Sequence, residues 1–169
     1  MAAFEPGPLI ERLLEARVEF AVVGGFAVIA HGYVRATKDL DIVPAPSIEN
    51  YRRLAALLRE LDAEQIGVDA NLLPNQPTDP AGLAEGGSFQ LTTALGRLDI
   101  LQESDAIPPY ERLATSCDRA QFRGHEVLVC SLPELMRMKR HAGRPQDIAD
   151  IAALESAHGA LGTDSDADV

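Results

Sequence analysis

Two aspartates separated by one residue are the first feature of this sequence that suggests chemistry. Asp39 and Asp41 flank Leu40 in a short run that continues with Ile42 and Val43. Residues i and i+2 of a β-strand point to the same side, so the two carboxylates would project from one face about 7 Å apart at Cα. Like charges this close repel unless a cation lies between them, and Mg²⁺ prefers hard oxygen ligands. The pattern predicts a metal site; the alternative is a pair of solvated acids on an exposed strand face.

A glycine pair upstream of these acids suggests a phosphate site. Gly24 and Gly25 follow the apolar run Phe20–Val23 and precede an apolar segment expected to be helical. A strand that ends in glycines and opens a helix presents free backbone amides and the positive end of the helix dipole, which attract phosphate. Gly25 has no side chain to block a close approach. A plain tight turn is the alternative.

A third acid occurs in the segment Arg97–Leu101. Asp99 is the only carboxylate there and lies between Leu98 and Ile100. It would complete the acidic cluster if this strand lies beside the first. A single aspartate in a strand is otherwise a surface residue or a salt-bridge partner, and that interpretation stays open.

One basic concentration stands out in an otherwise acidic chain, where a helix is expected to meet a loop. Its members are Lys139, Arg140, His141 and Arg144. The functional interpretation assigns Lys139 and Arg144 to a triphosphate, with Asp147 and Asp150 orienting these cations rather than binding metal. The alternative is charge that matches the dipole at the C-terminal end of a helix.

The glycine pair, the paired acids and the later strand acid together resemble the DNA polymerase β-like nucleotidyltransferase superfamily. The pattern is Val23-Gly-Gly25, thirteen residues, Asp39-Leu-Asp-Ile42 and then Asp99. The resemblance covers about residues 18–102, and the chain is most similar to minimal single-domain members, including toxins of toxin–antitoxin and abortive-infection systems. It implies that Asp39, Asp41 and Asp99 hold Mg²⁺, with Mn²⁺ as a substitute, and that Asp99 also activates an acceptor hydroxyl.

The resemblance extends to the nucleotide site and to the partners. It implies that Gly24 and Gly25 bind the triphosphate of an NTP, although many relatives have Gly-Ser there, so backbone amides would replace the serine hydroxyl. Relatives carry a similar arginine and threonine at Arg35 and Thr37; Arg35 would contact a phosphate or clamp Asp39. The neighbouring His31 is expected to pack or cap a helix end.

The implied activity is transfer of a nucleoside monophosphate from an NTP to a hydroxyl. The acceptor would be a tRNA 3′ end, a protein side chain or a small molecule such as an aminoglycoside, and a toxin would have an antitoxin partner. Two metal ions held by three acids suffice for this chemistry without a histidine. A catalytically silent nucleotide-binding or interaction module with the same fold is the alternative.

The elements that must position these residues alternate between strands and helices. Hydrophobic periodicity and turn residues predict helices, strands and one long proline- and glycine-rich loop. Ser47 is expected to cap one helix, and Ser131 with Glu134 to form a capping box at another. The expected helices are 9–17, 26–30, 48–61, 131–143 and 145–154, the expected strands are 20–23, 39–43, 65–68, 89–95, 97–101 and 126–130, and the loop is 71–87. This order predicts an α/β or α+β fold with a mixed sheet flanked by helices.

The length and net charge of the chain limit the number of domains and the kinds of partner. The 169 residues fit one domain, expected over 1–160, with a disordered acidic tail over 161–169. A formal net charge of −11 excludes a broad nucleic-acid surface and confines any such contact to a local patch. No apolar run is long enough for a membrane helix and no signal peptide is evident, so a cytoplasmic location is expected. Cys117 and Cys130 are expected to be reduced and buried.

Overall fold

The computed structural model describes residues 4–67 and 75–159, and a single mixed sheet organises this part of the chain. Its strand order is β3-β4-β5-β2-β1-β7-β6. The strands are β1 (Phe20–Val23), β2 (Asp39–Pro44), β3 (Glu64–Gln65), β4 (Phe89–Thr93), β5 (Gly96–Ile100), β6 (Asp118–Phe122) and β7 (His125–Val129). The helices are α1 (Gly7–Glu15), α2 (Gly24–Ala30), α3 (Ile48–Glu60), α4 (Pro80–Ala84), α5 (Tyr110–Ser116), α6 (Leu132–Ala142) and α7 (Pro145–His158). This architecture confirms the expected fold class.

The centre of the sheet is formed by three strands that carry the predicted site. Strand β2 pairs antiparallel with β1 and parallel with β5. On β2 and β5 the acids alternate with four fully buried aliphatic side chains: Leu40, Ile42, Leu98 and Ile100. Since neighbouring residues of a strand face opposite ways, one face of the sheet is apolar and the other carries the acids.

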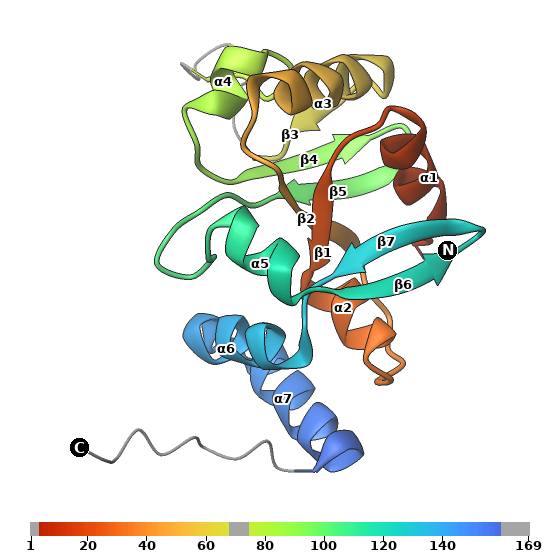
Figure 1. The fold of residues 1–169 in the computed structure, drawn as a ribbon, viewed down its shortest axis with the longest axis vertical. Coiled ribbons are helices and arrows are strands. Elements are labelled where there is room, and N and C mark those ends of the chain that lie inside the picture. Colours follow the sequence, from red (N-terminus) through yellow and green to blue (C-terminus); the bar gives the residue numbers. More distant parts are fainter. Residues whose placement is uncertain (1–3, 68–74, 160–169) are drawn as a thin grey trace.

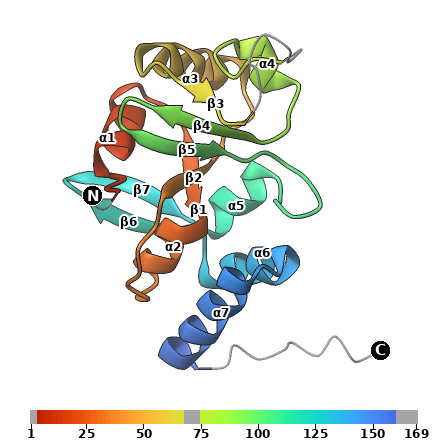
Figure 2. The same ribbon diagram turned by 180° about the vertical axis from the view of Figure 1, so that it is seen from behind.

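The apolar core is continuous with the first and third helices. Leu9 and Leu13 of α1 and Leu54 and Leu58 of α3 are fully buried and belong to the same cluster as the central strands. Ser47 accepts a hydrogen bond from the backbone amide of Asn50, which confirms the expected cap of α3. Helices α3 and α4 lie at one end of the molecule, beside β3 and β4, in both ribbon views (Figures 1 and 2).

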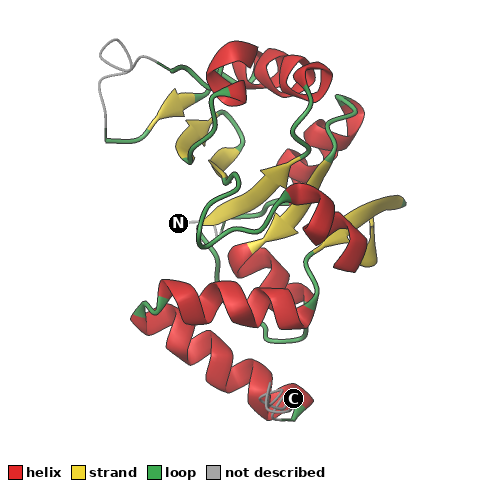
Figure 3. Cartoon of the chain, turned by 60° about the vertical axis from the view of Figure 1, so that its left-hand side comes forward, coloured by secondary structure: helices red, strands yellow, loops and turns green. Residues whose placement is uncertain are grey.

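The last two helices lie side by side at the other end of the molecule (Figure 3). Gly143, in the left-handed conformation at φ 62°, ends α6, and Pro145 opens α7, as the sequence predicts. Helix α6 also packs against α2, so the helical pair borders the acidic face of the sheet. None of the helices in the described ranges is long and apolar enough to cross a membrane.

Several local expectations need correction. Ser131 is the N-cap residue of α6, but its side chain caps no amide. The Glu134 side chain accepts hydrogen bonds from Arg112 and Arg137 and so does not reach back to the Ser131 amide. The expected loop over 71–87 contains the short helix α4, whose cap is the side chain of Asp79.

Two elements escaped the sequence analysis altogether, namely α5 and the edge strand β6. The strand expected over 65–68 is shorter and begins one residue earlier, at Glu64. Residues 68 and 71–74 and the expected tail at 161–169 lie outside the described residues. Both cysteines are free; Cys130 is buried as expected, whereas Cys117 is only half-buried.

Candidate active site

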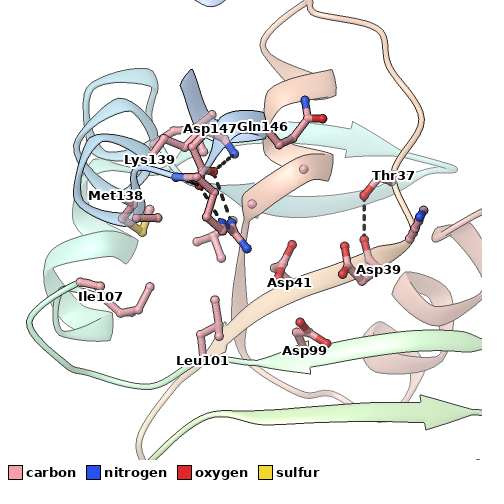
Figure 4. A pocket seen from close by; sticks show the side chains of 18 of the residues that line it. Thr37, Asp39, Asp41, Asp99, Leu101, Ile107, Met138, Lys139, Gln146 and Asp147 are labelled. Atoms are coloured by element: carbon pink, nitrogen blue, oxygen red, sulfur yellow. Dashed lines mark hydrogen bonds and ion pairs between the residues drawn. The ribbon is translucent and has the colours of Figure 1, made fainter. Parts of the chain in front are cut away.

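The three predicted acids lie on one face of two adjacent parallel strands. Asp41 of β2 is in register with Asp99 of β5, and Asp39 is in register with Arg97. Partners in register point to the same side of a sheet, so the alternation along each strand directs all three carboxylates to one side. Figure 4 shows the side chains of Asp39, Asp41 and Asp99 facing a shared space.

The glycine pair packs directly against these acids. Helix α2 starts at Gly24 itself, with no separate turn, and Gly24 has a left-handed φ of 64°. A Cβ atom at Gly24 would lie 2.0 Å from Oδ2 of Asp41, so only glycine fits. The amide of Gly25 donates a hydrogen bond to the Asp41 carboxylate, and a Cβ at Gly25 would lie 2.7 Å from Oγ1 of Thr37. The glycines therefore hold the helix start against the acidic strand.

Burial and neighbouring negative charges raise the pKa values of the clustered acids. Burial, together with the charges of Asp39 and Asp99, raises the pKa of Asp41 from 3.8 to about 7. Burial and the charge of Asp39 also raise the pKa of Asp99. Asp99 is only 6% exposed, and its buried Oδ1 has no hydrogen-bond partner, while Oδ2 accepts from Gln90 at 3.5 Å. A cation at this face would relieve both the repulsion and the unpaired oxygen.

A cavity of about 740 Å³ opens over the acidic face. Its walls come from the start of α2, the loop before β2, strands β4 and β5, and helices α6 and α7. One end is apolar, with Leu101, Ile107 and Met138, and the acids lie toward the other (Figure 4). All nine residues predicted for the site line this cavity: Gly24, Gly25, Arg35, Thr37, Asp39, Asp41, Asp99, Lys139 and Arg144.

Two buried aspartates of α7 bind the cations of the cavity wall. The Lys139 ammonium lies 3.0 Å from Asp147 and 2.7 Å from Asp150. Asp150 also binds Arg35 through two hydrogen bonds of 2.8 and 2.9 Å, and Asp147 accepts from Nε of Arg144 at 2.7 Å. Burial alone would raise the pKa of Asp147, but the hydrogen bonds from Arg144 and Lys139 outweigh it and lower the pKa to about 2. This network joins α6 and α7 to the loop between α2 and β2.

The two predicted phosphate-binding cations differ sharply in access. Lys139 is only 5% exposed, so it is not a surface residue. Its burial follows from its position on the face of α6 that packs on α7. The side chain of Arg144 is 73% exposed, and the charges of Asp147, Asp41 and Asp39 help to raise its pKa. Arg144 therefore remains accessible from the cavity while facing the acids.

The loop before β2 is anchored at three points. Thr37 donates a hydrogen bond from Oγ1 to the carbonyl of Asp39, which fixes the start of the acidic strand (Figure 4). Arg35 binds Asp150 and does not clamp Asp39. His31 is the C-cap residue of α2, and its Nε2 shares a hydrogen bond with the carbonyl of Cys130, in agreement with a packing role at the helix end.

The sequence analysis missed other residues of the cavity wall, including Lys38, Gln90 and Arg97. Arg97 lies two residues before Asp99 on the same strand, so the alternation that grouped the acids also places this arginine on their face. Lys38 is the immediate neighbour of Asp39. The sequence does not indicate Gln90 as a site residue, because its position beside Asp99 depends on the pairing of β4 with β5.

The arrangement as it stands is not a finished metal site. In the described ranges no group of three or more His, Cys, Asp or Glu side chains is gathered closely enough to hold a metal ion. The donor set still fits a divalent cation: hard oxygens on one face, one of them buried and unpaired.

Solved structures of similar shape identify the fold. The chain resembles the solution structure of the antibiotic-resistance factor ANT(2'')-Ia at 18% identity, with 90% of this chain and 84% of that one covered and a TM-score of 0.58. It also resembles the lincomycin-bound lincosamide antibiotic adenylyltransferase LnuA at 16% identity, covering 88% and 93%, with a TM-score of 0.57. A putative nucleotidyltransferase from Thermotoga maritima, TM1012, is 14% identical, covers 89% of both chains and has a TM-score of 0.54. The fold is that of a nucleotidyltransferase.

The family match is more specific than the fold. The model of the family described as nucleotidyl transferase AbiEii toxin, type IV toxin–antitoxin system, matches residues 10–167. The chain therefore belongs to the AbiEii nucleotidyltransferase toxin family and is a nucleotidyltransferase. No curated protein matches it significantly.

Proposed function

We propose that the chain transfers a nucleoside monophosphate from an NTP to a hydroxyl acceptor in a Mg²⁺-dependent reaction, and that it acts as the toxin of a toxin–antitoxin pair. The observation that carries the proposal is the register of Asp41 with Asp99 on parallel strands, beside a helix that starts at Gly24. Three carboxylates on one face of a cavity match the donor set that this chemistry needs.

Asp39, Asp41 and Asp99 would hold the metal, and Mn²⁺ would substitute for Mg²⁺. The bound metal neutralises charge on the phosphates and on the departing pyrophosphate. Asp99 is assigned a second role, because its Oδ1 is buried and unpartnered and its pKa is raised. Both properties favour acceptance of the acceptor's hydroxyl proton at that oxygen.

The triphosphate is assigned to the side of the cavity formed by α2 and Arg144. Arg144 is bound to Asp147 but stays exposed, whereas Lys139 and Arg35 are largely buried and bound to Asp150. We therefore assign phosphate contact to Arg144 and to the start of α2 at Gly24, and a positioning role to Lys139, Arg35, Thr37 and Gly25, since the Gly25 amide already binds Asp41. In the reaction the acceptor oxygen bonds to the α-phosphorus, the bond from that phosphorus to the α,β-bridging oxygen breaks, and pyrophosphate leaves.

Three classes of acceptor fit the proposed reaction. A tRNA 3′ end, a protein side chain and a small molecule all carry a suitable hydroxyl. The relatives of known structure include an enzyme complexed with adenylyl-2''-tobramycin and one bound to lincomycin, which favours a small-molecule acceptor as a second candidate. Toxicity would follow from modification of cellular RNA or protein, and an antitoxin would oppose it.

The test is a search for the labelled product. The protein is incubated with Mg²⁺ and each α-labelled NTP in turn, together with cellular RNA, cellular protein or a panel of aminoglycosides and lincosamides, and the product is identified by mass. Transfer of label to RNA or protein supports the toxin role, and label only on antibiotics would replace it with resistance. If no fraction takes label from any NTP, the chain is a silent nucleotide-binding or interaction module.

A further inference from the structure

In the described part of the chain, two of the five cationic side chains that line the cavity form no hydrogen bond or ion pair. Arg35, Lys139 and Arg144 are bound to the aspartates of α7. Lys38 and Arg97 also line the cavity, yet within residues 4–67 and 75–159 neither side chain forms a hydrogen bond or an ion pair. The positive charge of Arg97 partly offsets the raised pKa of Asp99. Lys38 and Arg97 form a cationic pair that the reaction as described above does not use.

The environment of Arg97 favours an anion. Arg97 is half-buried, and its Nε is buried without any hydrogen-bond partner in the described part of the chain. A buried donor left unpaired is unfavourable, and a charged one more so. An anion entering the cavity would satisfy it, and Lys38 is exposed and able to contribute a second positive charge.

Arg97 lies on the side of the acids away from the helix start. Arg97 is in register with Asp39, and Lys38 directly precedes Asp39, so both lie at the same end of β2 and β5. In the sheet β2 separates β5 from β1, which leads into Gly24. Arg97 and the triphosphate side therefore flank the acids from opposite directions.

We propose that Lys38 and Arg97 bind a phosphate group of the acceptor, close to the hydroxyl that Asp99 serves. The inference rests on the proposed function, because it assigns the anion to the second substrate of that reaction. A phosphorylated acceptor would otherwise be repelled by three aspartates in a protein of net charge −11, so a local pair of cations is needed. A neutral or cationic acceptor would leave both side chains without a role.

The experiment compares a charged with an uncharged probe of the same shape. A dinucleoside monophosphate has one phosphodiester beside a free 3′ hydroxyl, and its methylphosphonate analogue lacks the charge. Affinities for both, and for a non-hydrolysable NTP analogue with Mg²⁺, are measured by calorimetry in the wild type and in Arg97→Gln and Lys38→Gln. Arg52→Gln is the matched control, since Arg52 is exposed on α3 and outside the cavity wall.

The wild type is expected to bind the charged probe more tightly than the methylphosphonate. Arg97→Gln should weaken binding of the charged probe about tenfold and Lys38→Gln about threefold, with the uncharged probe and the NTP analogue unaffected. Arg52→Gln should change nothing. Equal affinity of the wild type for both probes, or unaltered discrimination in both variants, would overturn the proposal.

Loss of NTP-analogue affinity alone would also overturn it, because the anion would then belong to the donor. The proposed function has its own readout in the same titrations. A wild type that fails to bind the NTP analogue with Mg²⁺ contradicts that function, whatever the dinucleotide result.

Discussion

At the scale of single residues, Asp41 has a strongly raised pKa within the acidic cluster. Its pKa is about 7 in the folded protein against 3.8 for an ordinary aspartate, because of burial and of Asp39 and Asp99. Between these values the folded state binds a proton that the unfolded state has lost. Stability without metal therefore falls as pH rises from about 4 to about 7, by up to roughly 1.4 kcal/mol per pH unit.

Asp41→Asn should remove this dependence. In EDTA, urea unfolding of the wild type should show lower stability at pH 7 than at pH 5, whereas the variant should lose less between the two. Asp105→Asn, at an exposed acid outside the cavity wall, is the control and should behave like the wild type. Identical pH profiles for wild type and Asp41→Asn would show that Asp41 is an ordinary surface charge.

Gly24 offers a second test at this scale. Gly24→Ala combines the strain of a left-handed φ of 64° with a collision against Asp41 Oδ2. Gly124→Ala has a similar φ of 82° but open space around the new methyl group. Both should lose about 1 to 2 kcal/mol to backbone strain. Gly24→Ala should lose more stability and also most of the transferase activity; equal losses in the two variants would refute the contact with Asp41.

At the scale of elements, the buried carboxylate of Asp150 ties the terminal helices to the site. It is fully buried and binds Arg35 and Lys139. Asp150→Asn should destabilise the protein by about 3 to 5 kcal/mol in urea unfolding, because Arg35 loses its carboxylate partner and Lys139 keeps only Asp147. Glu155 lies on the same helix as Asp150 and forms an exposed pair with Arg140 of α6. Glu155→Gln should lower the free energy of unfolding by less than about 1 kcal/mol. A small loss in both would mean that the network does not hold the helices.

The elements also show what sequence reasoning could reach. Periodicity identified β1, β2, β5 and α3, because each has a strong apolar alternation or stripe and a clear stop. It missed β6, whose run Asp118–Phe122 is polar because an edge strand needs no buried face. The Glu134 half of the expected capping box does not form because its carboxylate binds two arginines, and one of them, Arg112, lies on a helix that the sequence did not indicate.

The sequence predicted which site residues lie together better than it predicted their burial and ion pairs. The i, i+2 rule placed Asp39 and Asp41 on one face, and the sheet then added Asp99 through its register. Burial of Lys139 against Asp147 and Asp150 was not predictable, since it depends on how α7 packs on α6. Long-range packing of this kind leaves no periodic trace in a single sequence.

At the scale of the whole molecule, metal binding should stabilise the fold. A cation that binds only the folded state adds about 2.7 kcal/mol at a concentration one hundred times its Kd. For a chain of this size the melting temperature should rise by several degrees when Mg²⁺ replaces EDTA at neutral pH. Asp39→Asn should reduce the rise, and Asp105→Asn should not. An equal rise in all three proteins would place the bound metal elsewhere.

The most direct test of the central claim is the release of pyrophosphate from an NTP in the presence of the acceptor fraction. With Mg²⁺, the wild type should release one pyrophosphate for each nucleoside monophosphate transferred. Asp39→Asn and Asp99→Asn should lose nearly all of it while remaining folded, and EDTA should abolish it in the wild type. Release that persists in both variants, or that is indifferent to EDTA, would contradict a metal-dependent transferase built on these three aspartates.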